Sequence, residues 1–274
     1  DAELGTGWLA SVTPAFDADR AVLIDDRWAT AREDLARLGT GETDLEAARQ
    51  TLAPERFTGL GAAVADQAAW WARALDGSEL PDAAERAGIA SAIAEAARRA
   101  PVAGADSVRW ADDVAVVTGF APRSIAAAVA GDLLAGGATV VATSSRLTHE
   151  RLDFAKRLYR EHASAGARLW IVPANLASYR DVDALTDWIG HDQVVTSGGS
   201  SKLVKAALVP TLLFPFAAPR VVGTLADAGP EAESQTRLLL WSVERSIASL
   251  SAIGTDTHVD HRLHVLLPGS PNRG

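Results

Sequence analysis

The stretch VTGFAPRSIAAAVAGDLLAGGATVVATSSR, residues 117–146, decides the fold of this chain. An apolar strand ends at Val117, and a turn with Gly119 leads into a helical pattern from Ser124 to Leu134. A second apolar strand follows from Thr139 to Ala142. A short apolar strand, a crossover helix and a second apolar strand are typical of a βαβ unit, whose two strands are parallel. The stretch therefore predicts a parallel sheet.

The same alternation continues toward the C-terminal end. The first strand begins at Val114, and further apolar runs follow at 169–172, 211–214 and 263–267. Further helical patterns occupy residues 150–162, 180–189 and 231–250. Five short apolar strands separated by four helices predict a sheet that is covered on both faces. The expected fold class is α/β, a doubly wound parallel sheet that is Rossmann-like but incomplete, preceded by an all-helical segment.

Residues 1–105 show helical periodicity and no convincing strand. Apolar residues recur at helical spacing from Val22 to Leu38, and further helical patterns follow. The sequence PVAGAD, residues 101–106, has the composition of a linker. The predicted domains are therefore a helical segment, 1–105, and an α/β domain, 106–274.

Composition excludes several classes of chemistry. The chain has 274 residues, no cysteine and a net charge of −9. The lack of cysteine excludes a disulfide framework, a thiolate zinc site and a cysteine nucleophile. The acidic excess argues against a nucleic-acid partner, and no apolar run approaches the ~18 residues that a membrane-spanning helix needs. A cytoplasmic protein without nucleic-acid or membrane partners is expected.

The histidines near the C-terminal end offer a competing site. His258, His261 and His264 are close in sequence, with Asp256 and Asp260 beside them. A zinc site needs ligands that converge with tetrahedral geometry. Because His264 enters an apolar strand while the other two histidines lie in the preceding loop, one metal would reach all three only if that loop bent sharply. No metal site is predicted.

The turn after the first strand is a candidate phosphate-binding site. Doubly wound folds place pyrophosphate there, because the N–H groups of the next helix point at it. The candidate cofactor contacts in this turn are Gly119, Arg123, Ser124 and Ile125. Arg123 and Ala126 stand where a dinucleotide-binding loop usually has its second and third glycines. A tight turn without any ligand is the open alternative.

The end of the second strand discriminates between cofactors. The strand runs into Thr143, Ser144, Ser145 and Arg146, with no acidic residue. NAD-binding versions of the fold have an Asp or Glu at this point, which accepts hydrogen bonds from the ribose hydroxyls. Hydroxyl and guanidinium groups suit a 2′-phosphate instead, because guanidinium forms charge-assisted hydrogen bonds with phosphate. The sequence therefore predicts NADPH, held by Ser144, Ser145 and Arg146, with Arg123 as a second positive charge.

Three segments carry a resemblance to a known family: residues 117–146, LLFPFAAPRVVG at 212–223 and LHVLLPGSPNRG at 263–274. On these segments, the region from Asp112 to Gly274 resembles the β-ketoacyl reductase of type I fatty acid synthases, which has a short-chain dehydrogenase/reductase fold. It is most similar to the single-chain bacterial form, and the arginine- and alanine-rich composition suggests an actinobacterial source. The first hundred residues resemble, on fewer distinctive residues, the segment that precedes the reductase.

The resemblance implies roles for further residues. Asn175, after the third strand, matches the polar residue that contacts the adenine, and Leu176 follows it. The segment matched to the nicotinamide ribose consists of Phe216, Ala217 and Ala218. Pro215 replaces an asparagine that simpler reductases have there. Ser270 matches the catalytic serine that hydrogen-bonds the substrate carbonyl, although Ser-Pro-Asn is also a good turn sequence.

The implied reaction is the NADPH-dependent reduction of a β-ketoacyl thioester, carried on an acyl carrier protein, to the β-hydroxyacyl thioester. The implied partners are the acyl carrier protein domain, other domains of the same synthase and further copies in a homo-oligomer. The proton-donating tyrosine and its lysine are expected shortly after Gly274, since neither Tyr159 nor Tyr179 lies at the end of the fifth strand. The chain is therefore expected to be a truncated piece that is inactive alone.

Two alternatives stay open. The chain could be a structural or docking segment of the synthase that retains nucleotide without turnover. It could also be the ketoreductase of a polyketide synthase, although Ser144 to Arg146 and the PFAAP sequence favour the fatty acid version. Whether the loop from Gly119 to Ala126 holds a cofactor separates the reductase from the docking segment.

Overall fold

A computed structural model describes residues 11–99, 109–164, 166–218, 230–255 and 262–269. These residues form a six-stranded sheet in the order β1-β4-β3-β2-β7-β8. Its strands are β1 (Val22–Ile24), β2 (Val114–Val117), β3 (Thr139–Ser144), β4 (Arg168–Pro173), β7 (Leu212–Phe214) and β8 (His264–Val265). Neighbouring strands from β4 to β8 are parallel. The predicted α/β fold with a Rossmann-like parallel sheet is confirmed.

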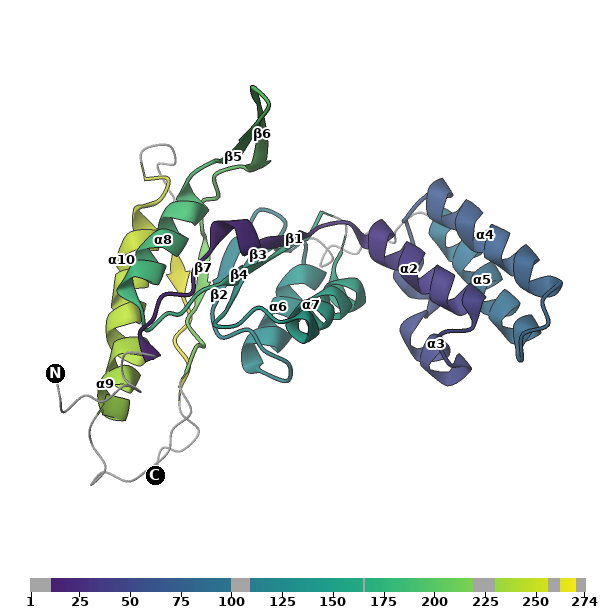
Figure 1. The fold of residues 1–274 in the computed structure, drawn as a ribbon, viewed down its shortest axis with the longest axis horizontal. Coiled ribbons are helices and arrows are strands. Elements are labelled where there is room, and N and C mark those ends of the chain that lie inside the picture. Colours follow the sequence, from purple (N-terminus) through teal and green to yellow (C-terminus); the bar gives the residue numbers. More distant parts are fainter. Residues whose placement is uncertain (1–10, 100–108, 165, 219–229, 256–261, 270–274) are drawn as a thin grey trace.

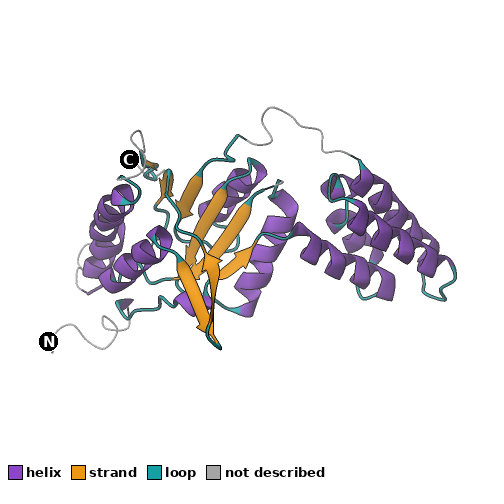
Figure 2. Cartoon of the chain, turned by 90° about the horizontal axis from the view of Figure 1, so that it is seen from above, coloured by secondary structure: helices purple, strands orange, loops and turns teal. Residues whose placement is uncertain are grey.

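Helices cover both faces of the sheet (Figures 1 and 2). One face carries α6 (Ile125–Ala135) and α7 (His149–His162). The other face carries α8 (Tyr179–Gly190), α9 (Pro230–Thr236), the π-helical turn η4 (Arg237–Trp241) and α10 (Ser242–Ala252). Because side chains alternate along a strand, Ala115 and Val117 of β2 belong to the first core and Val116 to the second. Two buried layers therefore hold the central strands in place.

The strand β1 corrects the expectation that no strand precedes residue 100. The short 3₁₀ turn η1 (Ala18–Arg20) leads into it, and Val22 of β1 pairs with Ile171 of β4 in an antiparallel register. A three-residue apolar run is too short to show a period of two, and it merges in the sequence with the helical pattern that follows it. Residues 22–24 thus form an edge of the sheet.

The remaining helices form a separate bundle (Figures 1 and 2). Its elements are α2 (Arg27–Thr40), α3 (Leu45–Thr51), η2 (Pro54–Phe57), α4 (Ala62–Asp76) and α5 (Ala83–Arg98). The bundle has its own buried core, which includes Leu35, Phe57 and Ile93. It is tied to the sheet layer by an ion pair in which Arg160 Nη1 of α7 donates to both carboxylate oxygens of Asp34 at 2.7 Å.

A β-hairpin that the sequence reading missed stands out from the sheet (Figure 1). It consists of β5 (Gln193–Ser197) and β6 (Ser200–Lys205), which pair only with each other among the described strands. Lys205 is buried at its base. Its Nζ donates hydrogen bonds of 3.0–3.1 Å to the carbonyls of Ile189, His191 and Ala206. The ammonium group therefore fastens the hairpin to the end of α8.

The buried Lys205 predicts a rise of stability with pH. Burial lowers the pKa of Lys205 to about 8 from its ordinary value of 10.5. The folded state therefore binds fewer protons than the unfolded state between these values, and stability increases as the pH rises through this window. We expect the free energy of unfolding to rise by about 1–2 kcal/mol from about pH 7.5 to about pH 9.5.

Denaturant unfolding at several pH values measures this effect. Lys205→Met should lack the rise, whereas Lys202→Met, on the exposed part of the same hairpin, should retain it. An identical pH profile for the protein and for Lys205→Met would show that this lysine does not cause the change.

Candidate functional site

A cleft of about 360 Å³ opens at the carboxyl ends of β2, β3 and β4. Its lining residues are Gly119, Phe120, Ala121, Ser124, Thr143, Ser144, Ser145, Arg151, Ala174, Asn175, Leu176, Phe216, Ala217, Ala218 and Leu238. In the sheet, β2 lies between β3 and β7, so the chain leaves β2 toward one side and later returns to its other side. Ligands of open α/β sheets bind at such a switch point.

The cleft brings together most of the predicted cofactor contacts. Those that line it are Gly119, Ser124, Ser144, Ser145, Asn175, Leu176, Phe216, Ala217 and Ala218. Arg123, Ile125 and Arg146 are exposed and do not line it. Ser270 lies outside the described residues, so its predicted catalytic role stays a prediction.

Gly119 sits where the turn after β2 touches the chain after β7. Its φ of +76° lies in the left-handed region, and an added Cβ would be 2.8 Å from the Cα and N of Ala217 and from the carbonyl oxygen of Phe216. Thr118 Oγ1 accepts a 2.9 Å hydrogen bond from Ala217 N. The backbone contact leaves no room for a side chain, so this floor of the cleft requires glycine.

The next residues turn the chain into α6. Arg123 has a φ of +61°, so it adopts a backbone angle of the kind that a glycine would favour at this position. Ser124 caps the helix: its Oγ accepts a hydrogen bond from Ala127 N at 3.1 Å and donates one to the carbonyl of Ala121 at 2.7 Å. The first N–H groups of α6 are thus oriented by the serine, and the side chain of Ile125 points into solvent at 70% exposure.

Arg151 is a cleft residue that the sequence reading missed. It lies in the first turn of α7, where Thr148 caps the helix and accepts a hydrogen bond from Arg151 N at 3.3 Å. Its Nη1 donates to the carbonyl of Phe120 at 3.0 Å and to the hydroxyl of Ser144. Its position in the sequence could have indicated this role, because the first turn of the helix that follows β3 lies near the carboxyl end of that strand.

Asn175 connects the cleft to residues 11–16, which we call the N-terminal segment. Its Nδ2 donates hydrogen bonds of 2.8 Å to the carbonyls of Ser11 and Thr13. Its Oδ1 accepts a hydrogen bond of 3.2 Å from Ala177 N. The two amide hydrogens are therefore already used, and the expected contact between Asn175 and adenine stays a prediction.

Asp181 also binds the N-terminal segment. The residue is buried, and its Oδ2 accepts hydrogen bonds of 2.7–2.8 Å from the backbone N–H groups of Ala15, Phe16 and Asn175. Ser178 caps α8, with its hydroxyl accepting from Asp181 N at 3.4 Å. One carboxylate thus joins the N-terminal segment, the end of β4 and the start of α8.

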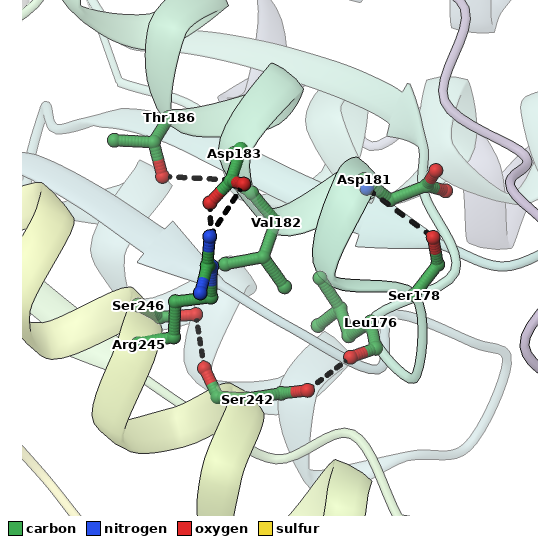
Figure 3. A network of polar contacts seen from close by, with 9 residues as sticks. All are labelled: Leu176, Ser178, Asp181, Val182, Asp183, Thr186, Ser242, Arg245 and Ser246. Atoms are coloured by element: carbon green, nitrogen blue, oxygen red, sulfur yellow. Dashed lines mark hydrogen bonds and ion pairs between the residues drawn. The ribbon is translucent and has the colours of Figure 1, made fainter.

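A second set of polar contacts fixes α10 beside the cleft (Figure 3). Ser242 of α10 donates to the carbonyl of Leu176, a cleft residue. On the outer surface, Arg245 forms a bidentate pair with Asp183 of α8, at 2.6 and 2.7 Å. These contacts join α10 to α8 and to the loop after β4. They therefore stabilise the side of the cleft that Leu176 lines.

The two tyrosines of the chain lie away from the cleft. Tyr159 is buried, and its hydroxyl donates to the carbonyl of Ala167 at 2.8 Å. Arg237 lies over the ring of Tyr179, with Cζ 4.2 Å from the centroid. The expectation that neither tyrosine supplies a proton to a substrate stays a prediction.

The structure bears on the histidine cluster and on membrane-spanning helices only within the described residues. His264 is in β8, whereas His258 and His261 lie outside the described residues. Within the described ranges, no three His, Asp or Glu side chains gather as metal ligands would. None of the helices in these ranges has both the length and the apolar character needed to cross a bilayer.

Comparisons with known proteins relate the chain to fatty acid synthases. It is 33% identical over 171 residues to the fatty acid synthase subunit alpha of Schizosaccharomyces pombe, which is 62% of this chain and 9% of that subunit. It is 32% identical over 174 residues to the corresponding subunit of Saccharomyces cerevisiae, again 62% and 9%. A third relative, the fatty acid synthase alpha subunit pigJ of Monascus ruber, is 41% identical over 95 residues, 35% of this chain and 5% of that protein.

Among solved structures, the chain is similar to L-sorbose reductase from Gluconobacter frateurii, complexed with NADPH and L-sorbose. The TM-score is 0.40 and the identity 23%, over 54% of this chain and 51% of that one. No protein-family model matches the chain.

These comparisons bear on the resemblance seen in the sequence. The chain spans about a tenth of the length of the synthase subunits that it matches. The three relatives are fungal, so the expected bacterial source stays a prediction. About three fifths of the chain is therefore similar to a short stretch of fatty acid synthase alpha subunits, and its fold is an α/β, Rossmann-like one.

Proposed function

We propose that this chain is the cofactor-binding part of an NADPH-dependent β-ketoacyl reductase in a fatty acid synthase. One observation carries the proposal: the cleft at the switch point of the sheet is lined by serines at the end of β3 and by one arginine, Arg151 of α7, and none of its described lining residues is acidic. An NAD site would have a carboxylate for the ribose hydroxyls at that point. The guanidinium of Arg151 suits a phosphate, whereas the hydroxyl of Ser144 already donates to the carbonyl of Arg146.

When bound, NADPH would supply the hydride that reduces the β-carbon of a β-ketoacyl thioester on an acyl carrier protein. The glycine turn and the N–H groups at the start of α6 would bind the pyrophosphate. Phe216, Ala217 and Ala218 would contact the nicotinamide ribose, and Ser270 would hydrogen-bond the substrate oxygen. Neither tyrosine of the chain lines the cleft, so the proposal gives the role of proton donor to neither of them. The partners are the other domains of the synthase, in a homo-oligomer.

Binding tests the cofactor half of the proposal. Titration of the chain with NADPH and with NADH should show NADPH binding at least about tenfold tighter, since only NADPH offers a phosphate for charge-assisted hydrogen bonds. Equal affinities for the two dinucleotides, or binding of neither, would contradict the proposal. The docking alternative predicts that nucleotide binds while substitutions of Ser270 have no effect on any activity.

Activity tests the other half. In the full-length synthase, Ser270→Ala should lower the rate of ketoacyl reduction by about 10²-fold, because one donor to the developing oxyanion is lost. The affinity for NADPH should be unchanged, since this hydroxyl acts on the substrate. Ser251→Ala, an exposed serine of α10, serves as the control. A normal rate in Ser270→Ala would leave Ser-Pro-Asn as a turn only.

A further inference from the structure

Arg151 joins the two loops between which a dinucleotide would lie. Through Nη1 it contacts the carbonyl of Phe120, in the turn after β2, and the hydroxyl of Ser144, at the end of β3. Both of these residues line the cleft. The guanidinium group is therefore held at the corner where the glycine turn meets the second strand.

Arg151 is also the one charged residue in the described lining of the cleft. It is half-buried, and no carboxylate pairs with it among the described residues. Arg123 and Arg146, which the sequence pointed to, are exposed and absent from the lining. A partly buried cation without a counter-ion favours an anionic ligand, because desolvation is compensated only when a negative charge is close.

The free edge of the guanidinium suits a phosphate. Nη1 is used by the two protein acceptors, whereas Nε and Nη2 make no hydrogen bond to any described residue. These two groups form the side edge of the planar fork, which can bind two oxygens of one phosphate. In a doubly wound fold, the end of the second strand is where the adenosine ribose presents its 2′ position.

We propose that Arg151 binds the 2′-phosphate of NADPH and thereby sets the preference for NADPH over NADH. The inference rests on the proposed function, because it assumes that the cleft binds a dinucleotide. The bonds to Phe120 and Ser144 hold the guanidinium in place before the cofactor arrives. Arg146, which is exposed in the loop after β3, makes at most a secondary contribution to binding of this phosphate.

The test is the affinity of Arg151→Gln for NADPH, NADH, 2′-AMP and 5′-AMP, measured by titration calorimetry. We expect NADPH and 2′-AMP to bind about 10- to 100-fold more weakly, the loss typical of a hydrogen-bonded charged pair. Affinities for NADH and 5′-AMP should stay within about twofold. Arg151→Lys, which keeps the charge, should retain part of the preference. Arg157→Gln, an exposed arginine on the same helix, should bind all four as the unchanged protein does.

Each other outcome has a definite meaning. If Arg151→Gln weakens NADPH and NADH equally, Arg151 only fastens the two loops and the inference is wrong. If Arg146→Gln removes the preference and Arg151→Gln does not, the phosphate belongs to Arg146. If the unchanged protein binds none of the four nucleotides, the proposed function itself fails, and the assignment of Arg151 with it.

Discussion

Replacing Gly119 by alanine is expected to destroy nucleotide binding. The new Cβ would lie 2.8 Å from backbone atoms of Ala217 and Phe216, which cannot rotate away as a side chain can. Either the turn after β2 or the chain after β7 must shift, and both line the cleft. We expect NADPH affinity to fall by more than about 100-fold. Overpacking and the left-handed φ should lower the free energy of unfolding by about 2–4 kcal/mol.

Gly166 provides the matched control for this substitution. Its φ of +88° is also left-handed, but no atom lies within 4 Å of the position of an added Cβ. Gly166→Ala should therefore show backbone strain alone, about 1 kcal/mol, and leave NADPH binding intact. Equal losses of stability in the two variants, with the nucleotide still bound by Gly119→Ala, would show that the close backbone contact does not shape the cleft.

Asp181→Ala is expected to be the most destabilising substitution in the sheet domain. Three backbone N–H groups lose a charged acceptor at 2.7–2.8 Å, in a site where the carboxylate is 1% exposed. Hydrogen bonds to charged groups contribute about 1.5–3 kcal/mol each, and such losses are not additive. We expect a loss of about 4–5 kcal/mol in the free energy of unfolding. Denaturant unfolding measures it.

Asp183 lies two residues further along the same helix and provides the control. It is also an aspartate with a partner, but it is exposed. It pairs with Arg245 on the surface (Figure 3), with half of its side chain exposed. Asp183→Ala should therefore change stability by less than about 1 kcal/mol. A proteolysis time course adds a local readout, since Asp181→Ala should expose the N-terminal segment to cleavage and Asp183→Ala should not. Similar stabilities for the two variants would refute the central role of Asp181.

The sequence predicted the regular part of the sheet domain, because there one period dominates each segment. The strand from Val114 to Val117 has the predicted ends, and α6 begins within a residue of the helical pattern read at Ser124. Two elements escaped. Apart from Gln193 and Lys205 at its base, the hairpin β5–β6 is exposed, so its strands have no buried face to impose an alternation. The long helix expected over 231–250 is interrupted by a π-helical turn at Arg237–Trp241, which alters register without a proline or glycine signal.

The candidate site was likewise predictable only where it depends on local sequence patterns. Residues read from local patterns, the turn glycine and the serines after β3, line one cleft. Contacts that depend on distant segments could not be read: Asn175 reaches Ser11 and Thr13, and nothing local to Asn175 points to them. Arg151 escaped because its role depends on which side of α7 faces the cleft. Spacing along one segment is visible in a sequence, whereas proximity between segments is not.

The antiparallel pairing of β1 with β4 makes the helical bundle an insertion. Among the described residues, the chain passes through β1 of the sheet, continues through α2 to α5, and returns to the sheet at β2. When the chain is synthesised, β1 emerges first but meets its partner only after the bundle, β2 and β3 have been made. The bundle has its own core and can fold during this wait, whereas the sheet acquires its edge late. Deletion of the bundle with a short link between β1 and β2 would thus keep the sheet continuous, while removal of everything before β2 would strip away β1 and uncover the edge of β4.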